Sequence, residues 1–124
     1  MRISIFSGRL GVSSFPSECD NLNLFADFVS LHWASLPDAS WSPFNQGDTL
    51  VHEIGHWLGL QHTFDGGCSA TGDSVADTPA ERSPARGCPV ALDTCTDSDG
   101  LDPVTNYMDY TDDCCMYTFT NGQV

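Results

Sequence analysis

The string His-Glu-Ile-Gly-His-Trp-Leu-Gly-Leu-Gln-His at positions 52–62 constrains the fold of this 124-residue chain more than any other feature. Histidines four residues apart share one face of a helix, so His52 and His56 can bind one metal ion. Gly59 permits a sharp backbone turn, which brings His62 back as a third nitrogen ligand. Five fixed residue types at these spacings occur by chance in roughly one chain in 10⁵ of this length.

Three protein ligands leave the fourth position of a tetrahedral zinc ion open, which is typical of catalytic and not of structural zinc sites. Zinc lowers the pKa of a bound water to about 7 and so provides a nucleophile. Glu53 follows the first ligand and is the expected general base, which passes the proton to the leaving amine. The string therefore predicts zinc-dependent hydrolysis of peptide bonds, with His52, His56 and His62 as zinc ligands.

The region around this string is the best helix candidate in the chain. Apolar residues recur there at helical spacing, with Asp48 as the expected cap and Gly59 as the expected end; they are Leu50, Ile54, Trp57 and Leu58. Residues 2–6 alternate polar and apolar, and residues 28–33 are rich in strand-forming types, so both segments predict short strands. Residues 65–102 show turn chemistry without periodicity, which predicts irregular structure.

Six cysteines are many for a chain of this length, and no two are spaced as C-x-x-C. This spacing argues against a zinc ribbon or a redox motif and favours disulfides, hence an oxidising compartment and export. The first eight residues nevertheless lack the apolar region and cleavage site of a signal peptide. We therefore expect a mature fragment or a truncated gene product.

The composition excludes several classes of partner. The chain has four arginines, no lysine and seventeen acidic residues, for a formal net charge of −13. Nucleic acids and anionic membrane surfaces need clustered cations, so neither is an expected partner. There is also no apolar run of the ~18 residues that a membrane span requires. Most of the acidic residues are expected to be solvated surface, although some of those after Leu60 have the oxygen chemistry that calcium prefers.

The elongated zinc motif resembles that of the metzincins, in which a Met-turn follows the motif. Within that clan, residues 47–64 resemble the secreted fungal and bacterial pappalysins nearly end to end. Further similar segments are 72–79, 87–89, 106–113, 115–116 and 119–123. The resemblance covers residues 42–124 well and residues 3–38 more loosely.

The resemblance implies roles for residues outside the zinc motif. Met108 would be the Met-turn residue, and Tyr110 would stabilise the oxyanion of the tetrahedral intermediate. The implied disulfides are Cys68–Cys95 and Cys88–Cys115. Cys19 and Cys114 fall outside the family pattern, and both an extra pairing and free thiols stay open for them. The implied calcium ligands are Asp73, Asp77 and Thr78, although the same residues also suit a solvated turn.

The fold implied is an α+β, metzincin-like catalytic domain. Residues 1–59 would form an incomplete N-terminal sheet with the active-site helix, and residues 60–124 an irregular, disulfide-bonded C-terminal subdomain with the Met-turn. Pappalysin catalytic domains have further strands and a long helix before the point that resembles Arg2. We therefore expect a partly exposed apolar face on the active-site helix, marginal stability and low activity of this chain alone.

The expected function is that of a secreted zinc metalloendopeptidase, whose polypeptide substrate adds as a strand along the edge near residues 28–33. The alternative is a truncated, non-catalytic zinc-binding remnant that acts as a secreted interaction module; the intact Glu53 argues against it. A disulfide-rich binding domain without metal is a second alternative, which a zinc content near zero in folded protein would support.

Overall fold

The computed structural model describes residues 1–6, 8–19 and 27–124, which divide into two units, Met1–Gly59 and Leu60–Val124. The first unit contains a three-stranded sheet of β1 (Arg2–Phe6), β2 (Gly11–Ser13) and β3 (Phe28–His32). The strand order is β1-β3-β2, with β1 parallel and β2 antiparallel to β3. Both predicted strands are present, and β3 stops one residue early because Trp33 begins a 3₁₀ turn.

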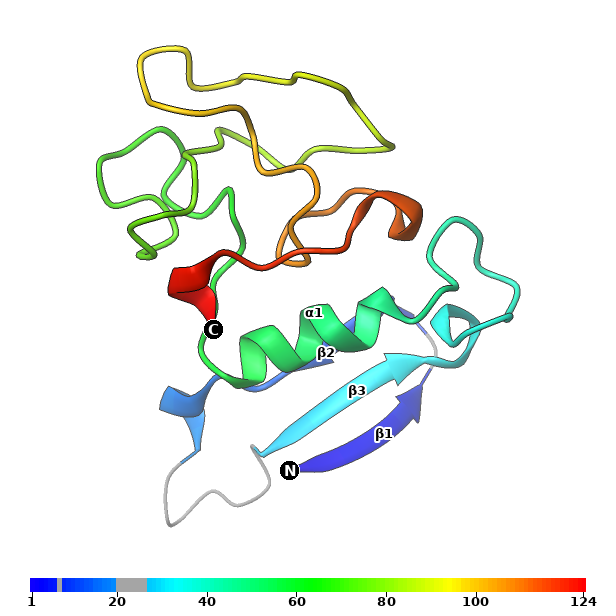
Figure 1. Ribbon diagram of the computed structural model, residues 1–124. Helices are drawn as coiled ribbons and strands as arrows, with labels where there is room; N and C mark the ends of the chain where they lie inside the picture. Colours follow the sequence, from blue (N-terminus) through cyan, green and yellow to red (C-terminus); the bar gives the residue numbers. More distant parts are fainter. Residues whose placement is uncertain (7, 20–26) are drawn as a thin grey trace. The chain divides into compact units, whose positions relative to one another are not determined.

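The central position of β3 corrects the prediction about substrate binding. β3 pairs on both sides, with Arg2 opposite Phe28 in β1 and Gly11 opposite Leu31 in β2 (Figure 1). A strand whose backbone groups already pair on two sides has none left for an added peptide. The prediction of strand addition along residues 28–33 is therefore wrong, and the outer strands of this sheet are β1 and β2.

Helix α1 (Asp48–Trp57) packs against β2 and β3. It begins one residue earlier than expected, because the N-cap residue is Gly47, with φ of 105°, and not Asp48. Gly59 also has φ of 105°, a backbone conformation that side chains with a Cβ resist, so its predicted role in the turn is confirmed. Within the described residues no helix has the length and apolarity that crossing a bilayer requires.

The buried face of α1 is polar and not the apolar stripe that the sequence suggested. Its buried residues are Thr49, His52, Glu53, Gly55 and His56. The predicted apolar positions 50, 54 and 57 are only half-buried, and Leu58 is 66% exposed. Trp57 secures its position by donating a hydrogen bond from Nε1 to Asp27 Oδ1 at 2.8 Å. The buried face of α1 thus contains the predicted zinc ligands His52 and His56 and the predicted base Glu53.

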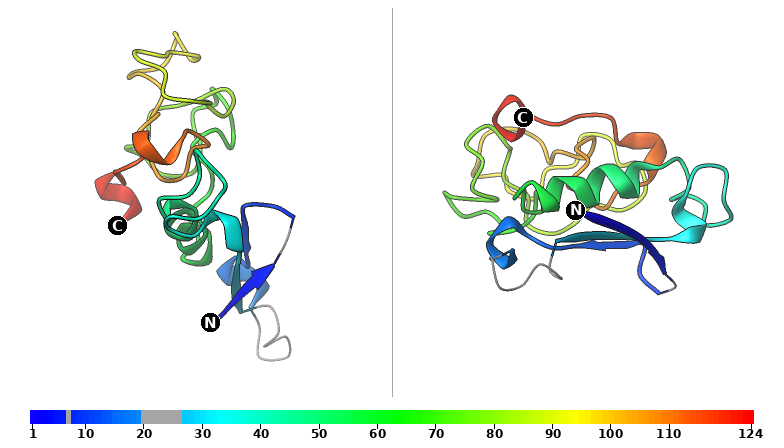
Figure 2. Two further views of the ribbon diagram at one scale, coloured as in Figure 1. Left: turned by 90° about the vertical axis from the view of Figure 1, so that its right-hand side faces the viewer. Right: turned by 90° about the horizontal axis from the view of Figure 1, so that it is seen from below.

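The second unit is built from loops, as the sequence predicted (Figure 2). Its regular elements are two 3₁₀ turns, η4 (Asp113–Cys115) and η5 (Asn121–Gln123), and a bridge between Asn106 and Thr118. Two disulfides cross-link it, Cys68–Cys95 and Cys88–Cys115, which confirms the pairing implied by the family resemblance.

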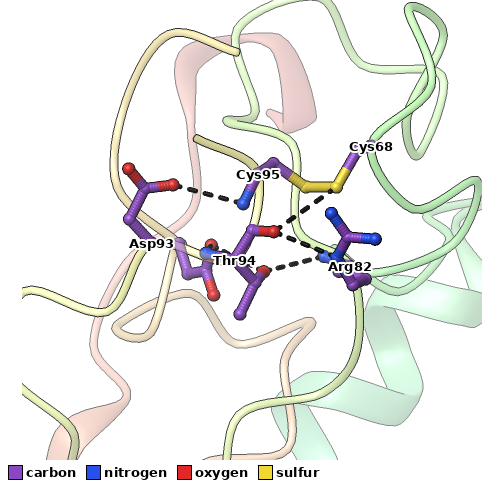
Figure 3. Close-up of a disulfide and its surroundings, with 6 residues drawn as sticks. Cys68, Arg82, Asp93, Thr94 and Cys95 are labelled. Atoms are coloured by element: carbon purple, nitrogen blue, oxygen red, sulfur yellow. Dashed lines mark hydrogen bonds between the residues drawn. A yellow bond between two sulfur atoms is a disulfide. The ribbon is translucent and has the colours of Figure 1, made fainter. Parts of the chain in front are cut away.

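The surroundings of the Cys68–Cys95 disulfide show how these loops are held together (Figure 3). Thr94 accepts two hydrogen bonds from Arg82, at 2.9 Å to its Oγ1 and 3.1 Å to its backbone oxygen. Asp93 accepts another from the Cys95 backbone N–H at 3.2 Å. Hydrogen bonds between side chains and backbone therefore satisfy polar backbone groups that sheet or helix hydrogen bonds satisfy elsewhere.

Buried carboxyl groups form much of the interior of the second unit. Glu81 is fully buried and accepts hydrogen bonds from Thr63 Oγ1 at 2.7 Å and from Ala85 N–H at 3.2 Å. Asp109 accepts from the same Ala85 N–H at 3.1 Å. Burial, with the charge of neighbouring carboxylates, raises the pKa of Glu81 to about 7 and that of Asp109 to about 6.

These raised pKa values predict that the second unit loses stability as the pH rises. The ordinary pKa of glutamate is 4.5, so between pH 4.5 and about 7 folded Glu81 holds a proton that the unfolded chain has released. Folding is then favoured by acidification, and the thermal midpoint should fall as pH rises from 5 to 8 in chelator-treated protein. Glu81→Gln should weaken this pH dependence. A midpoint that rises over this interval in both proteins would contradict the prediction.

Candidate metal centre

Helix α1 provides the first two predicted ligands and the predicted base. His52 and His56 lie one turn apart, with ring centroids 4.7 Å apart and rings perpendicular. Both side chains are buried, and the Phe15 ring packs against His56 at 5.2 Å. The spacing that suggested a shared metal therefore does bring the two imidazoles together.

His62 completes the predicted set after the turn at Gly59. The ligand nitrogens of His52, His56 and His62 all lie within 4.8 Å of one another. Ligand nitrogens around a tetrahedral zinc ion at 2.0–2.1 Å are about 3.3 Å apart, which this grouping accommodates. Three imidazoles are also a donor set that zinc prefers. The residues present therefore fit zinc.

Asp65 orients the third imidazole. Its Oδ2 accepts a hydrogen bond from the His62 backbone N–H at 3.0 Å and lies 3.4 Å from His62 Nδ1. A carboxylate beside Nδ1 favours a proton on that nitrogen, which leaves Nε2 as the metal-binding nitrogen. Asp65 is not part of the zinc motif, and its position three residues after a ligand was the available signal in the sequence.

Tyr110 lies beside that same nitrogen. Its hydroxyl is 3.0 Å from His62 Nε2, and the two rings meet edge to face at 4.8 Å. The guanidinium of Arg86 lies over the Tyr110 ring, 4.9 Å from its centroid. The phenol is therefore positioned next to the atom that a zinc ion would bind.

Glu53 is buried and held by strand β2. The Ser13 hydroxyl donates to Glu53 Oε2 at 2.8 Å. Burial raises the pKa of Glu53, and the hydrogen bond from Ser13 offsets part of this rise, so that the resulting pKa is about 7. A Cβ at Gly11 would lie 2.6 Å from Glu53 Cγ, so only glycine fits there. Sequence reasoning missed both residues, since a three-residue strand shows no alternation to detect.

Removing the Ser13 hydroxyl should change the pH dependence of any reaction that uses Glu53 as base. Ser13→Ala removes a donor that stabilises the carboxylate, so the pKa of Glu53 should rise further. The acidic limb of the kcat/KM profile should then move to higher pH, by about one unit. Ser13→Thr keeps a hydroxyl and should stay near the wild-type profile. An acidic limb that is unchanged in Ser13→Ala would rule out this role for Ser13.

Met108 is fully buried, and its backbone is fixed on both sides. Its N–H donates to Asn106 Oδ1 at 2.9 Å, and its carbonyl accepts from the Thr63 N–H at 3.2 Å. The turn that contains Met108 is therefore attached to the residue directly after His62.

The three predicted calcium ligands have different surroundings. Asp77 accepts from Thr120 Oγ1 at 2.7 Å and from the Gly122 N–H at 2.9 Å, so both its oxygens already hold the C-terminal turn. Asp73 Oδ2 and Thr78 Oγ1 are buried and make no hydrogen bond of normal geometry. Burial raises the pKa of Asp73, and the nearby Thr78 hydroxyl partly offsets that rise.

Comparison with known proteins decides the family. A peptidase family model described as pregnancy-associated plasma protein-A matches residues 10–124. The chain belongs to this family, the pappalysins. The match reaches further toward the N-terminus than residues 42–124, where the sequence resemblance is strongest.

Individual pappalysins and a solved structure agree with this assignment. An extracellular metalloprotease of Pyricularia oryzae is 48% identical over 120 residues, and extracellular metalloprotease 1 of Coccidioides posadasii is 48% identical over 118 residues. These alignments cover 97% and 94% of this chain, and 42% of each relative. The structure of mature mirolysin from Tannerella forsythia, in complex with a cleaved peptide, matches with a TM-score of 0.81 and 38% identity. It covers 98% of this chain and 47% of mirolysin.

These comparisons show that the fold is that of a pappalysin, and thus metzincin-like, catalytic domain. The three-histidine group together with the family indicates zinc as the metal of this site. The chain spans about two fifths of the length of the curated relatives that it matches.

Proposed function

We propose that this chain carries the zinc-binding and catalytic machinery of an extracellular metalloendopeptidase. The observation that carries the proposal is the grouping of three imidazoles within 4.8 Å, with the buried carboxylate of Glu53 next to the first of them in the sequence. Relatives named as extracellular metalloproteases and two disulfides support an extracellular location. Units 1–59 and 60–124 would be the two subdomains of the catalytic domain.

Glu53 acts as the general base in this proposal. When bound, zinc supplies Lewis-acid polarisation of the scissile carbonyl and increases the acidity of water. Glu53 accepts the proton of the attacking water at its carboxylate and delivers it to the leaving amine nitrogen. Ser13 fixes one carboxylate oxygen, and the missing side chain at Gly11 provides room for the other. Asp65 holds His62 in the tautomer that the site requires.

Tyr110 would stabilise the oxyanion, and Met108 would be the Met-turn residue. The Tyr110 hydroxyl lies 3.0 Å from His62 Nε2, close enough to the metal-binding nitrogen to donate a hydrogen bond to a developing negative charge. Met108 holds its turn to Thr63 through its carbonyl oxygen.

The substrates would be polypeptides bound in extended form along β2. This strand is an outer strand of the sheet, and its Ser13 contacts the proposed base. Backbone pairing to β2 would deliver a peptide carbonyl to the residues that act on it. The mirolysin structure in complex with a cleaved peptide supports a peptide as the class of substrate.

Zinc content and peptide cleavage, measured together, test the proposal. The full chain should hold about one zinc ion, and its cleavage of casein should disappear with chelator and return with added zinc. His62→Ala should lose both zinc and activity. Zinc bound at full stoichiometry without cleavage would instead support a non-catalytic remnant, and folded protein without zinc would overturn the ligand assignment.

We also infer that Asp73 and Thr78 bind calcium. Two buried oxygens that make no hydrogen bond of normal geometry suit a hard cation, whose charge would relieve the raised pKa of Asp73. Calcium should raise the thermal midpoint of the wild-type chain, and the shift should grow with calcium concentration. Asp73→Asn should lose most of this shift, whereas the exposed control Asp97→Asn should keep it. Equal shifts in both variants would reject the site.

A further inference from the structure

Three sulfur atoms lie together in the second unit, in a group that contains none of the three histidines. The Sγ atoms of Cys88, Cys114 and Cys115 are all within 4.8 Å of one another. Cys88 and Cys115 form a disulfide, and Cys114 has a free thiol. The Cys114 Sγ lies 3.4 Å from the Cys88 Sγ and 3.8 Å from the Cys115 Sγ. A nucleophilic side chain therefore lies directly beside a disulfide bond.

We propose that Cys114 is an intramolecular thiol–disulfide exchange site. The Cys114 thiolate attacks Cys88 Sγ, so that a Cys88–Cys114 bond forms and the Cys88–Cys115 bond breaks. The electron pair leaves on Cys115 Sγ, which becomes a thiolate and takes a proton from water. One disulfide and one thiol are present before and after the step, so no oxidant or reductant is needed.

Geometry selects Cys88 as the atom attacked. It is the nearer of the two disulfide sulfurs. Attack on Cys115 would instead join neighbouring residues, whose Cα atoms are about 3.8 Å apart across a trans peptide, below the usual 4.4–6.8 Å of a disulfide. The side chains of Cys88 and Cys114 are both exposed, so rotation of Cys114 into line with the bond meets little packing.

Chain entropy favours neither disulfide isomer. Cys88 and Cys115 are 27 residues apart, and Cys88 and Cys114 are 26 apart. The cost of closing a loop depends on the logarithm of its length, so the two isomers have nearly the same cost. The other disulfide, Cys68–Cys95, is an internal control that should not exchange. Cys95 is buried, and among the described residues no third cysteine is grouped with this pair.

The exchange would move a covalent attachment along the chain. The present bond connects Cys88 to the end of η4, next to a hydrogen bond from Asp112 N–H to the Gly87 carbonyl at 3.1 Å. In the other isomer the attachment moves one residue toward Tyr110. The protein would then exist as two covalent isomers that differ in the tether of this segment. This inference does not depend on the proposed peptidase activity.

Mapping of the labelled thiols tests the exchange on the full chain. Protein kept at acidic pH is brought to about pH 9, where thiols ionise, and samples are quenched with acid and alkylated over time. Non-reduced peptide mapping should show a growing Cys88–Cys114 cross-link, and fragment spectra should show alkylation moving from Cys114 to Cys115 until both isomers are present. Because the step is intramolecular, its half-time should not change when the protein is diluted tenfold.

Two variants separate the exchange from other thiol reactions. Cys114→Ser should abolish all labelling of Cys115, whereas Cys19→Ser, which removes the other exposed thiol, should leave the rate unchanged. Label that stays on Cys114 throughout would overturn the proposal. So would a half-time of exchange that lengthens on dilution of the protein, or exchange that vanishes in Cys19→Ser. These three results are measured on the wild-type chain and on Cys19→Ser, so the test stands even if Cys114→Ser does not fold.

Discussion

Glu53→Gln is expected to lower kcat for peptide cleavage by about 10²–10⁴-fold while zinc content stays near that of the wild type. Glutamine has nearly the same shape, and its carbonyl oxygen can still accept the hydrogen bond from Ser13. It cannot take up the proton of the attacking water. Because Glu53 is not a ligand, the three imidazoles should bind metal as before. Zinc analysis and cleavage kinetics on the same preparation measure both quantities.

Glu18→Gln is the matched control for this experiment. Glu18 is exposed, and its carboxylate accepts a hydrogen bond from the Phe15 N–H. Its replacement removes the same charge from the same unit and should change kcat less than twofold. Cleavage by Glu53→Gln at close to the wild-type rate would mean that another group serves as base. Loss of zinc in Glu53→Gln would mean that the residue supports the site structurally.

Removing the Cys68–Cys95 disulfide, by replacing both cysteines with alanine, should cost the second unit about 3–4 kcal/mol of unfolding free energy. A loss of this size is severe, since whole domains are usually stable by only about 5–15 kcal/mol. The apolar core of this unit is small, and its buried apolar residues are Ala85, Cys95, Met108 and Met116. Denaturant unfolding followed by circular dichroism measures the change.

The Cys88–Cys115 pair provides a matched comparison. Both disulfides join residues 27 apart, so the chain-entropy model assigns them equal stabilisation. Cys68 and Cys88 are both exposed, but Cys95 is buried whereas Cys115 is only half-buried. Replacing the first pair should therefore cost more, by the packing that Cys95 loses. A loss below about 1 kcal/mol for the first pair would show that the hydrogen-bonded loops keep their structure without the cross-link.

The metal site was predictable because its information is local. The spacing of His52 and His56 follows from the helical repeat, and Gly59 permits the turn before His62. The family resemblance supplied the disulfide partners, which spacing alone leaves open. The strand order was not predictable, because pairing joins segments far apart in sequence. Reading residues 28–33 as an edge failed for this reason.

Burial was also hard to read from residue type. The expectation that most acidic residues are solvated surface does not hold for the residues that the structure describes, where six acidic side chains are exposed and six are buried. Glu81 and Asp109, for example, lie in the interior of the second unit, where Thr63 and backbone N–H groups replace water. Nothing in their immediate sequence separates them from exposed neighbours. Gly11 and Ser13 were missed because their role depends on Glu53, forty residues away in the case of Ser13.

The complete burial of Met108 bears on how this protein withstands oxidants outside the cell. Oxidation turns a methionine thioether into a polar sulfoxide, which disrupts the packing around it. Met108 has no exposed surface and Met116 is 8% exposed, whereas Met1 is 52% exposed. Peroxide should therefore oxidise Met1 first, and Met1 is distant in the sequence from His62 and its neighbours. The turn that carries Met108 is chemically shielded for as long as the second unit stays folded.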